Sequence, residues 1–302
     1  MTKTYSGKIE AIYTYPVKSL QGISLASSKL NRFGLFGDRQ WMLVDEKKGF
    51  LSQRKLPKMA TISTAVRDGK IFLSKPGLGE IELQSSQDKQ LPISIWQDQC
   101  KAFVATADVN RWLSDALETH TIECVQFIEN EIRTPGELKR FGDTARHFCD
   151  GSPFLISTVE SLNALNTALL EDGIPPVDMR HFRANIVVSG IDAFTEHNYQ
   201  TLQVKTCEDA PALKFTLVDH CQRCSIITVD PDTGKFRKKG TPLVQLAKLN
   251  AMPNKAKAPA FGVNAIVQIS ESTSTTRQAD DSYNHVSPVQ TELVVGQEVI
   301  FS

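Results

Sequence analysis

The chain has 302 residues and carries 34 basic and 34 acidic side chains, so its formal net charge at pH 7 is zero. This balance argues against the overall positive field by which nucleic-acid and anionic-membrane binders attract their partners. Residues 1–7 are polar and no run approaches the length of a membrane span, so the sequence predicts a cytoplasmic protein with no nucleic-acid and no membrane partner.

The first half of the chain predicts mostly strands. Alternating or β-branched apolar residues occur at 8–15, 23–30, 40–45, 60–66, 71–73, 93–96 and 100–104. The tetrapeptide Arg67-Asp68-Gly69-Lys70 is a tight-turn signal, which predicts a hairpin between two of these strands. One short helix is expected after Asp108, which can cap it, with apolar residues at 109, 112, 113 and 117 on one face.

The second half predicts more strands around a few helices. Residues 129–146 are charged and contain a Pro-Gly pair, which indicates a domain boundary or a long loop that shapes the active site. Ser157-Thr158-Val159-Glu160 predicts a capping box, in which Ser157 caps a helix and Glu160 reaches back. Strands are expected at 185–188, 201–205, 212–218, 225–229, 262–269 and 291–301, with an exposed loop at 268–288. We therefore predict a mainly β fold with some helices (α+β), built as two β-barrel-like domains at residues 1–125 and 126–302.

The run His220-Cys221-Gln222-Arg223-Cys224 is the most informative stretch, because predicted strands flank it on both sides. A thioredoxin-type redox pair sits at a helix start, and here a turn cluster at 230–234 follows instead. A cation between two thiols favours thiolate, the form that binds soft metals. Two alternatives stay open: a zinc half-site, although the sequence offers no second ligand pair, and a packed pair of thiols. Cys221 is the more typical core residue of the two, and His220 is expected to be a core or turn histidine.

Five segments together resemble one known family. They occur in the family's order and span nearly the whole chain, which makes the resemblance specific. The family is the MOSC superfamily, in the form that has an N-terminal β-barrel domain, and the most similar branch holds YcbX-type bacterial proteins and mitochondrial amidoxime-reducing components. The segments are Tyr15-Pro16-Val17-Lys18-Ser19-Leu20, Gly37-Asp38-Arg39-Gln40-Trp41, Phe182-Arg183-Ala184-Asn185-Ile186-Val187, Cys221-Gln222-Arg223-Cys224 and Phe261-Gly262-Val263-Asn264.

The resemblance implies a molybdenum cofactor held by a pterin dithiolene and one protein cysteine. The resemblance implies that Cys224 is both the metal ligand and the catalytic residue. It implies that the cofactor phosphate is bound by Lys18, Ser19 and Arg39, and that the pterin is bound by Asp150, Gly151, Ser152, Arg183, Asn185 and Arg223. Gly151 departs from relatives that have a hydroxyl side chain there. Taken alone, Lys18 and Arg39 would be interpreted as solvated charges, and Arg54 is a weaker phosphate candidate of the same kind.

The implied activity is the reduction of small N-hydroxylated compounds. The sequence contains neither a tight run of cluster-binding cysteines nor a dinucleotide fingerprint, so we expect an external electron donor, such as a flavin reductase or a ferredoxin-like protein. The alternative is a carrier that moves the cofactor, or sulfur as a Cys224 persulfide. The family is also associated with pyridoxal phosphate binding. Room for a substrate beside Cys224 would favour the enzyme, and a cysteine on a protruding loop would favour the carrier.

Overall fold

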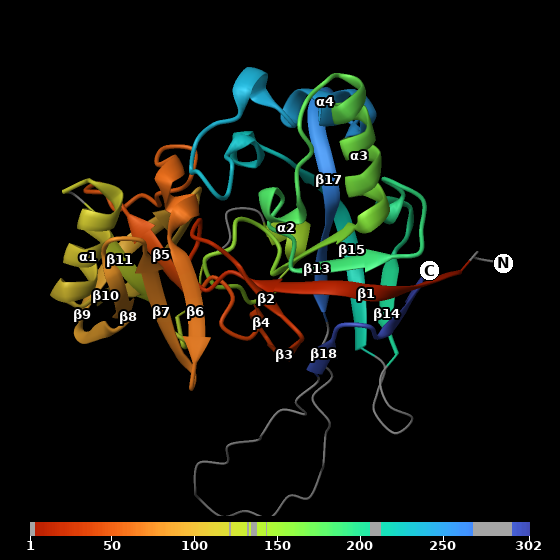
Figure 1. Cartoon of the computed structure of the whole chain (residues 1–302). Helices are drawn as coiled ribbons and strands as arrows, with labels where there is room; N and C mark the ends of the chain where they lie inside the picture. The colour runs from red at the N-terminus through yellow and green to blue at the C-terminus, as the bar shows by residue number, and fades with distance from the viewer. Residues whose placement is uncertain are drawn as a thin grey trace, which may run out of the picture.

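The computed structural model describes residues 4–120, 122–131, 133, 138–142, 144–205, 213–267 and 292–302. Within these residues the fold is mainly β with a few helices, which confirms the predicted fold class. Figure 1 shows two lobes, one built from the strands between residues 41 and 127 and the other around a barrel. The loop predicted at 268–288 lies outside the described residues.

Seven strands close into the barrel of the second lobe. Apolar and polar residues alternate along them: in the strand at 213–222, Leu213, Phe215 and Leu217 are buried while Lys214 and Thr216 are exposed. The buried side chains form one core cluster with Ile9, Phe154 and Phe301. In order around the barrel, the strands are β12 (Phe154–Thr158), β13 (Ile186–Ser189), β1 (Tyr5–Thr14), β19 (Glu298–Phe301), β14 (Thr201–Val204), β15 (Leu213–Gln222) and β17 (Lys255–Val267), which pairs back onto β12.

Helical segments cover the outside of this barrel. Leu165 and Leu169 of the helix α3 (Val159–Glu171) pack with Leu246 of α4 (Leu243–Leu249) against Phe261 of β17. Short strands β2 (Ile23–Leu25) and β16 (Ala251–Met252) extend the barrel from β1 and β17. The remaining helical segments of this lobe are η2 (Met179–His181), η3 (Glu196–Asn198), η4 (Ser225–Thr228) and η5 (Lys238–Gly240).

The first lobe contains two antiparallel sheets and a helix. One sheet runs β5 (Trp41–Val44), β11 (Glu123–Phe127), β10 (Asp98–Ala105), β9 (Ser85–Ile95), and the other β6 (Ser63–Arg67), β7 (Lys70–Lys75), β8 (Gly79–Glu82). The predicted hairpin is confirmed, since Arg67 pairs with Lys70. The helix α1 (Ala107–Leu117) and η1 (Pro57–Thr61) complete the lobe, while β3 (Ser27–Asn31), β4 (Gly34–Leu35), β18 (Glu292–Val294) and α2 (Leu138–Phe141) lie along the connections.

Three local predictions are wrong for reasons visible in the backbone. Thr106, not Asp108, is the N-cap residue of α1. The predicted capping box does not form, because β12 continues through Thr158, which becomes the N-cap residue and accepts from the Ser161 amide at 3.1 Å. Glu160 instead accepts from the Gly190 amide at 2.9 Å. Residues 225–229 form no strand: the β-branched run folds into the 3₁₀ segment η4, and Val229 keeps one bridge to Phe236.

The first lobe is an insertion between two barrel strands, because it follows β1 and precedes β12 in the chain. β1 pairs with β13 on one side and β19 on the other, and Figure 1 shows it running through the second lobe before the chain enters the first. The predicted domain boundary at residue 125 therefore has strands of one barrel on both sides of it. Among the described residues, no helix has the length and apolar character to cross a bilayer.

Candidate functional site

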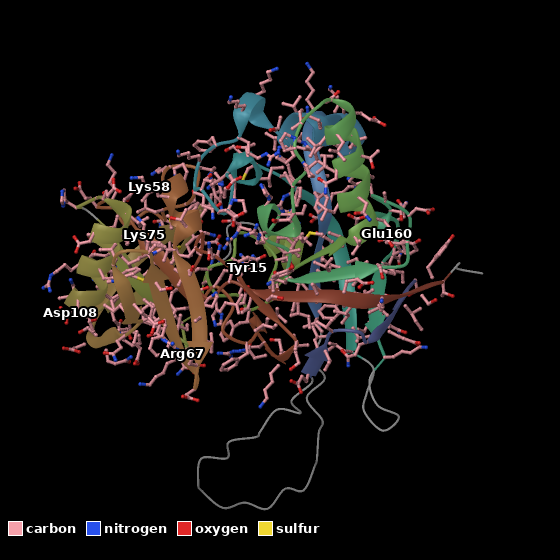
Figure 2. All side chains as sticks on the ribbon, viewed as in Figure 1. Tyr15, Lys58, Arg67, Lys75, Asp108 and Glu160 are labelled. Carbon is pink, nitrogen blue, oxygen red and sulfur yellow. The ribbon has the colours of Figure 1, made fainter. Side chains whose placement is uncertain are left out.

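All ten site residues expected from the sequence line a single cavity of about 170 Å³ between the two lobes. Backbone hydrogen bonds bring the segments together: the Arg39 amide donates to Tyr15 O at 2.8 Å, and the Tyr13 amide donates to Asn185 O at 2.8 Å. Figure 2 labels Tyr15 near the junction of the lobes, where its hydroxyl donates to Ala184 O at 3.1 Å. The ten residues are Lys18, Ser19, Arg39, Asp150, Gly151, Ser152, Arg183, Asn185, Arg223 and Cys224.

Backbone strain concentrates at this cavity. Among the described non-glycine residues, nine have a positive φ, and three of them line it: Ser19 at 69°, Arg39 at 48° and Arg183 at 57°. Such conformations persist only where surrounding contacts impose them, and they gather at ligand sites. Here the Ser19 carbonyl accepts from Gln53 Nε2 at 2.8 Å, and the Arg183 carbonyl accepts from Arg39 Nη2 at 3.3 Å.

Lys18 is buried and paired at the edge of the cavity. Its ammonium donates to Asp150 Oδ1 at 2.6 Å and to Phe148 O at 2.8 Å. Burial lowers the pKa of Lys18, and Asp150 opposes that effect. The Lys18 ammonium and a hydrogen bond from Trp96 Nε1 at 2.8 Å hold the pKa of the Asp150 carboxyl well below its usual range. Asp150, half-exposed, is thus a carboxylate that helps to orient Lys18.

Arg39 is not the solvated charge that its sequence context suggested. Its side chain is 13% exposed, and Nη1 donates to Asp38 Oδ2 at 2.5 Å and to Asn185 Oδ1 at 2.9 Å. Burial alone would lower the pKa of Arg39, and the ion pair with Asp38 raises it. Asn185 also donates to Tyr13 O at 3.3 Å, so both ends of its amide already have protein partners. We interpret Asn185 as a residue that positions Arg39, rather than one whose amide is free for a ligand.

Two other arginines at the cavity each have a guanidinium nitrogen without a hydrogen-bond partner among the described residues. Arg183 donates to Leu20 O at 2.6 Å and lies over the Tyr15 ring, yet its Nη2 atom is buried without a hydrogen-bond partner among the described residues. Arg223 donates to Phe182 O at 2.6 Å and to Cys221 Sγ at 2.9 Å, and its Nε atom is likewise unpartnered there. Burial, together with nearby Arg39, lowers the pKa of Arg183 to about 10, so it stays charged at neutral pH. Buried unpaired guanidinium nitrogens are costly, which makes this wall of the cavity a site for an acceptor-rich ligand.

The cysteines at the cavity differ in exposure. Cys224 is exposed at the start of η4, and Arg54 Nη1 from the first lobe lies 3.4 Å from its sulfur. Cys221 is partly buried, and Arg223 donates to it. Cys149 also lines the cavity but is buried, and burial raises the pKa of its thiol, which disfavours the thiolate. Cys224 is therefore the sulfur best placed to ligate a metal.

The turn at 150–152 is held by a buried charge network. Arg133 donates to Asp98 at 2.7 Å and to His147 O at 2.7 Å, and Arg146 donates to Asp98 at 3.1 Å and to Gly151 O at 3.3 Å. The hydroxyl of Ser152 donates to Ala265 O on β17. A side chain at Gly151 would come within 3.1 Å of the Phe141 ring, so glycine suits this tight turn. Gly151 and Ser152 both line the cavity wall.

Sequence reasoning missed a second, larger cavity of about 630 Å³ that shares Cys224, Gly151 and Asp150 with the first. Its other walls include Arg54, Trp96, Phe141 and Arg140, and Arg140 forms an ion pair with Asp219 at 2.6 Å. Trp96 is exposed and has a positive φ of 56°. An exposed tryptophan in the turn after a strand was the available signal. Asn264 also lines both cavities, and it was quoted in the sequence only as part of a segment.

The comparisons with known proteins fit this geometry. The model of the MOSC N-terminal beta barrel domain matches residues 6–120, and that of the MOSC domain matches residues 143–283. Mitochondrial amidoxime reducing component 2 of Rattus norvegicus is 30% identical over 249 residues, which cover 77% of this chain and 70% of the relative. The chain belongs to the MOSC family.

Other relatives carry two different names. Mitochondrial amidoxime reducing component 2 of Homo sapiens is 28% identical, with 77% of this chain and 70% of the relative covered. The molybdenum cofactor sulfurase of Oryza sativa subsp. japonica is 29% identical and covers 79% of this chain, but the chain spans only 30% of that protein. The predicted family is confirmed. For the zinc alternative, the described residues contain no group of three or more His, Cys, Asp or Glu able to hold an ion.

Proposed function

We propose that this MOSC protein binds a molybdenum–pterin cofactor and reduces N-hydroxylated compounds. One observation carries the proposal: ten residues chosen from sequence line one cavity, and the exposed sulfur of Cys224 also borders a second cavity with room for a substrate. The relatives include an amidoxime reducing component and a molybdenum cofactor sulfurase, and both names support the same cofactor class.

The residues present fit such a cofactor. Cys224 offers a soft ligand, which suits a metal already bound by dithiolene sulfurs. The unpartnered Arg183 Nη2 and Arg223 Nε supply donors for a pterin rich in acceptors. Lys18 and Ser19 supply the polar end for a phosphate, beside Arg39, whose charge is already paired with Asp38. Cys221 serves this arrangement indirectly, because it accepts from Arg223 and helps to fix that guanidinium.

In the proposed reaction, R–NHOH takes up two electrons and two protons and gives R–NH₂ and water. The bound cofactor supplies the two electrons. The chain's own contribution is placement. Arg54 lies over the Trp96 ring and reaches Cys224, so the pair forms one wall of the larger cavity beside the sulfur. We propose that the N-hydroxylated substrate occupies this larger cavity, next to Cys224.

The test compares two serine variants. Cys224→Ser should remove molybdenum retention and the reduction of an aromatic amidoxime, because a hydroxyl is a poor ligand for a soft metal. Cys221→Ser should keep most of both, since a serine hydroxyl can also accept the hydrogen bond that Arg223 donates to this sulfur. Molybdenum per chain, measured by mass spectrometry, and amidoxime turnover with reduced viologen are the readouts. Equal losses in both variants, or full activity of Cys224→Ser, would refute the assignment.

The carrier function is the second candidate, and the match to the sulfurase supports it. A carrier of sulfur would accept the outer sulfur atom of a persulfide donor onto Cys224, which is exposed, and the donor would leave as a thiol. Its position at the border of two cavities, rather than on a protruding loop, favours the enzyme. A persulfide on Cys224 that is passed to an acceptor protein, with no amidoxime turnover by the molybdenum-loaded chain, would reverse this preference. Pyridoxal phosphate binding stays an untested prediction.

A further inference from the structure

One segment departs sharply from the neutral charge of the chain. Residues 235–257 contain seven Lys and Arg side chains and no Asp or Glu. Arg237 is partly buried and donates to the carbonyls of Pro175 and Pro176. The other six are exposed, and none of the six forms an ion pair with a described residue: Lys235, Lys238, Lys239, Lys248, Lys255 and Lys257. We call these six lysines, together with residues 235–257 that carry them, the lysine face.

The lysine face is tied at both ends to the turn that carries Cys224. At its start, the Arg237 amide donates to Thr228 O at 2.7 Å, and Thr228 belongs to η4, whose N-cap residue is Cys224. At its end, Lys255 Nζ approaches Gln222 Oε1 at 3.4 Å, and the Arg223 amide donates to Pro259 O at 2.8 Å. Figure 1 draws this part of the chain, from the loop before α4 to the upper end of β17, along the top of the molecule.

Apolar side chains stand among the lysines. Phe236, Val244 and Leu249 are 49%, 46% and 43% exposed, and all three lie within the lysine-rich segment. On α4, Val244 and Lys248 are four residues apart and share a face. Among the nearby acids, Asp232 is paired with Arg180 at 2.6 Å, whereas Asp172, which accepts from the neutral Gln245 amide at 3.3 Å, keeps its charge. Apolar centres rimmed by unpaired charge are typical of a protein–protein contact.

We propose that the lysine face docks a small acidic electron-transfer protein, and that this partner delivers the electrons used at Cys224. The inference rests on the proposed function, which needs an external donor. Charge complementarity selects an acidic partner and speeds its encounter, while the exposed apolar residues supply the contact once it is docked. A membrane surface fits less well, because α4 has only seven residues and buries Leu246 in the core, which leaves too little apolar face to enter lipid.

The experiment reverses charge on the lysine face and measures binding and turnover separately. Lys238→Glu with Lys248→Glu changes two exposed residues outside both cavities. The matched control, Lys47→Glu with Lys101→Glu, makes the same net change on the first lobe, where both lysines are exposed and form no ion pair with described residues. A third variant, Val244→Ser, probes the apolar part. The probes are an acidic flavodoxin and an acidic plant-type ferredoxin, vesicles with anionic lipid, and reduced methyl viologen.

We expect the wild type and the control to bind one of the two acidic carriers with a Kd that rises steeply with salt, and the lysine-face variant to bind about tenfold or more weakly. Carrier-driven amidoxime turnover should fall in parallel, while viologen-driven turnover stays unchanged. Equal binding by the lysine-face variant and the control, or binding of vesicles but of neither carrier, overturns the docking proposal. If the molybdenum-loaded wild type shows no viologen-driven turnover, the proposed function is overturned. The binding comparison between the lysine-face variant and the control still tests whether the carrier docks on the lysine face.

Discussion

At the scale of single residues, the arginines of the cavity wall differ in whether their guanidinium donors already have protein partners. Arg39 neutralises Asp38, a carboxylate that is 3% exposed and also accepts from the Tyr15 amide at 2.8 Å. Among the described residues, Arg183 donates to the Leu20 carbonyl and to no carboxylate, and its Nη2 atom has no hydrogen-bond partner. The sequence resemblance assigned both arginines to the cofactor, Arg39 to its phosphate and Arg183 to its pterin. Only the fold distinguishes a structural charge from one with a free donor.

This difference gives opposite expectations for two variants. Arg39→Ala leaves Asp38 buried without its cation, so the free energy of unfolding should fall by about 3–5 kcal/mol. Arg183→Gln should lower cofactor content with a smaller stability loss, because the donor directed at the ligand is removed and no carboxylate is left unpaired. Thermal melts and molybdenum content, measured together, separate the two effects. A stable Arg39→Ala protein that merely lacks cofactor would show that Arg39 serves the ligand, as its sequence position suggested.

His197 and His220 are a residue-scale feature with a pH signature. Their rings stack with centroids 3.7 Å apart, and burial, with the charge of His220, lowers the pKa of His197 from 6.5 to about 4. The unfolded chain therefore binds this proton more tightly than the folded one. Stability that is fully present above about pH 6.5 is lost as the pH falls toward 4, by at most about 3 kcal/mol. His197→Gln should flatten this acid limb in urea unfolding, whereas His120→Gln, at an exposed position, should leave it intact.

At the scale of elements, the closure of the barrel depends on one glycine. Gly262 of β17 has a φ of +77°, and a Cβ atom there would lie 2.5 Å from Ser157 Oγ and 2.7 Å from Ile156 O on β12. β12 and β17 are the strands whose pairing closes the barrel, and Asn264 of β17 faces Leu155 of β12 in that ladder. A side chain at 262 would thus push apart the two strands that carry part of the cavity wall.

Gly262→Ala should lower stability by about 2–4 kcal/mol, because backbone strain and a backbone clash add. The matched control is Gly77→Ala, whose φ of +84° is similar and whose Cβ would meet nothing within 4 Å, so it should cost only about 1 kcal/mol. Urea midpoints of both variants give the measurement. Equal destabilisation would mean that the contact with β12 relaxes freely and that Gly262 is needed for its backbone conformation alone.

Elements whose pattern is set locally were predictable from sequence. The hairpin at 67–70 and the strand at 213–217 follow from turn chemistry and alternation, which the chain displays residue by residue. The prediction of a capping box at 157–160 was wrong because the pairing of Thr158 with Val188 extends β12 by one residue. The segment 225–229 failed because β-branched residues suit a strand, while the hydrogen bond from Ile227 N to Cys224 O closes a tight turn instead.

At the scale of the whole molecule, the cavity exists because the chain leaves the barrel and returns to it. The resemblance segments located the site residues, yet spacing could not show that Lys18, Arg183 and Cys224 would face one cavity. That convergence comes from long-range pairing: β1, at the start of the chain, lies between β13 and β19, and the first lobe is inserted before β12. Local sequence patterns carry little information on such partners, which are brought together only when loops of many residues close.

The insertion leads to a prediction about two shortened chains. Residues 126–302 alone lack β1, which leaves β13 and β19 without their shared neighbour and opens the barrel, so this fragment should aggregate or stay unfolded. A variant that deletes residues 41–126 keeps β1, and its new ends are adjacent, since the Phe127 amide donates to Gln40 O at 2.8 Å. Joined by a short Gly-Ser linker, it should retain barrel circular dichroism, although exposed Val17 and Leu20 lower its stability. A cooperative melt from the fragment 126–302 would instead favour an independent domain with its boundary at residue 125.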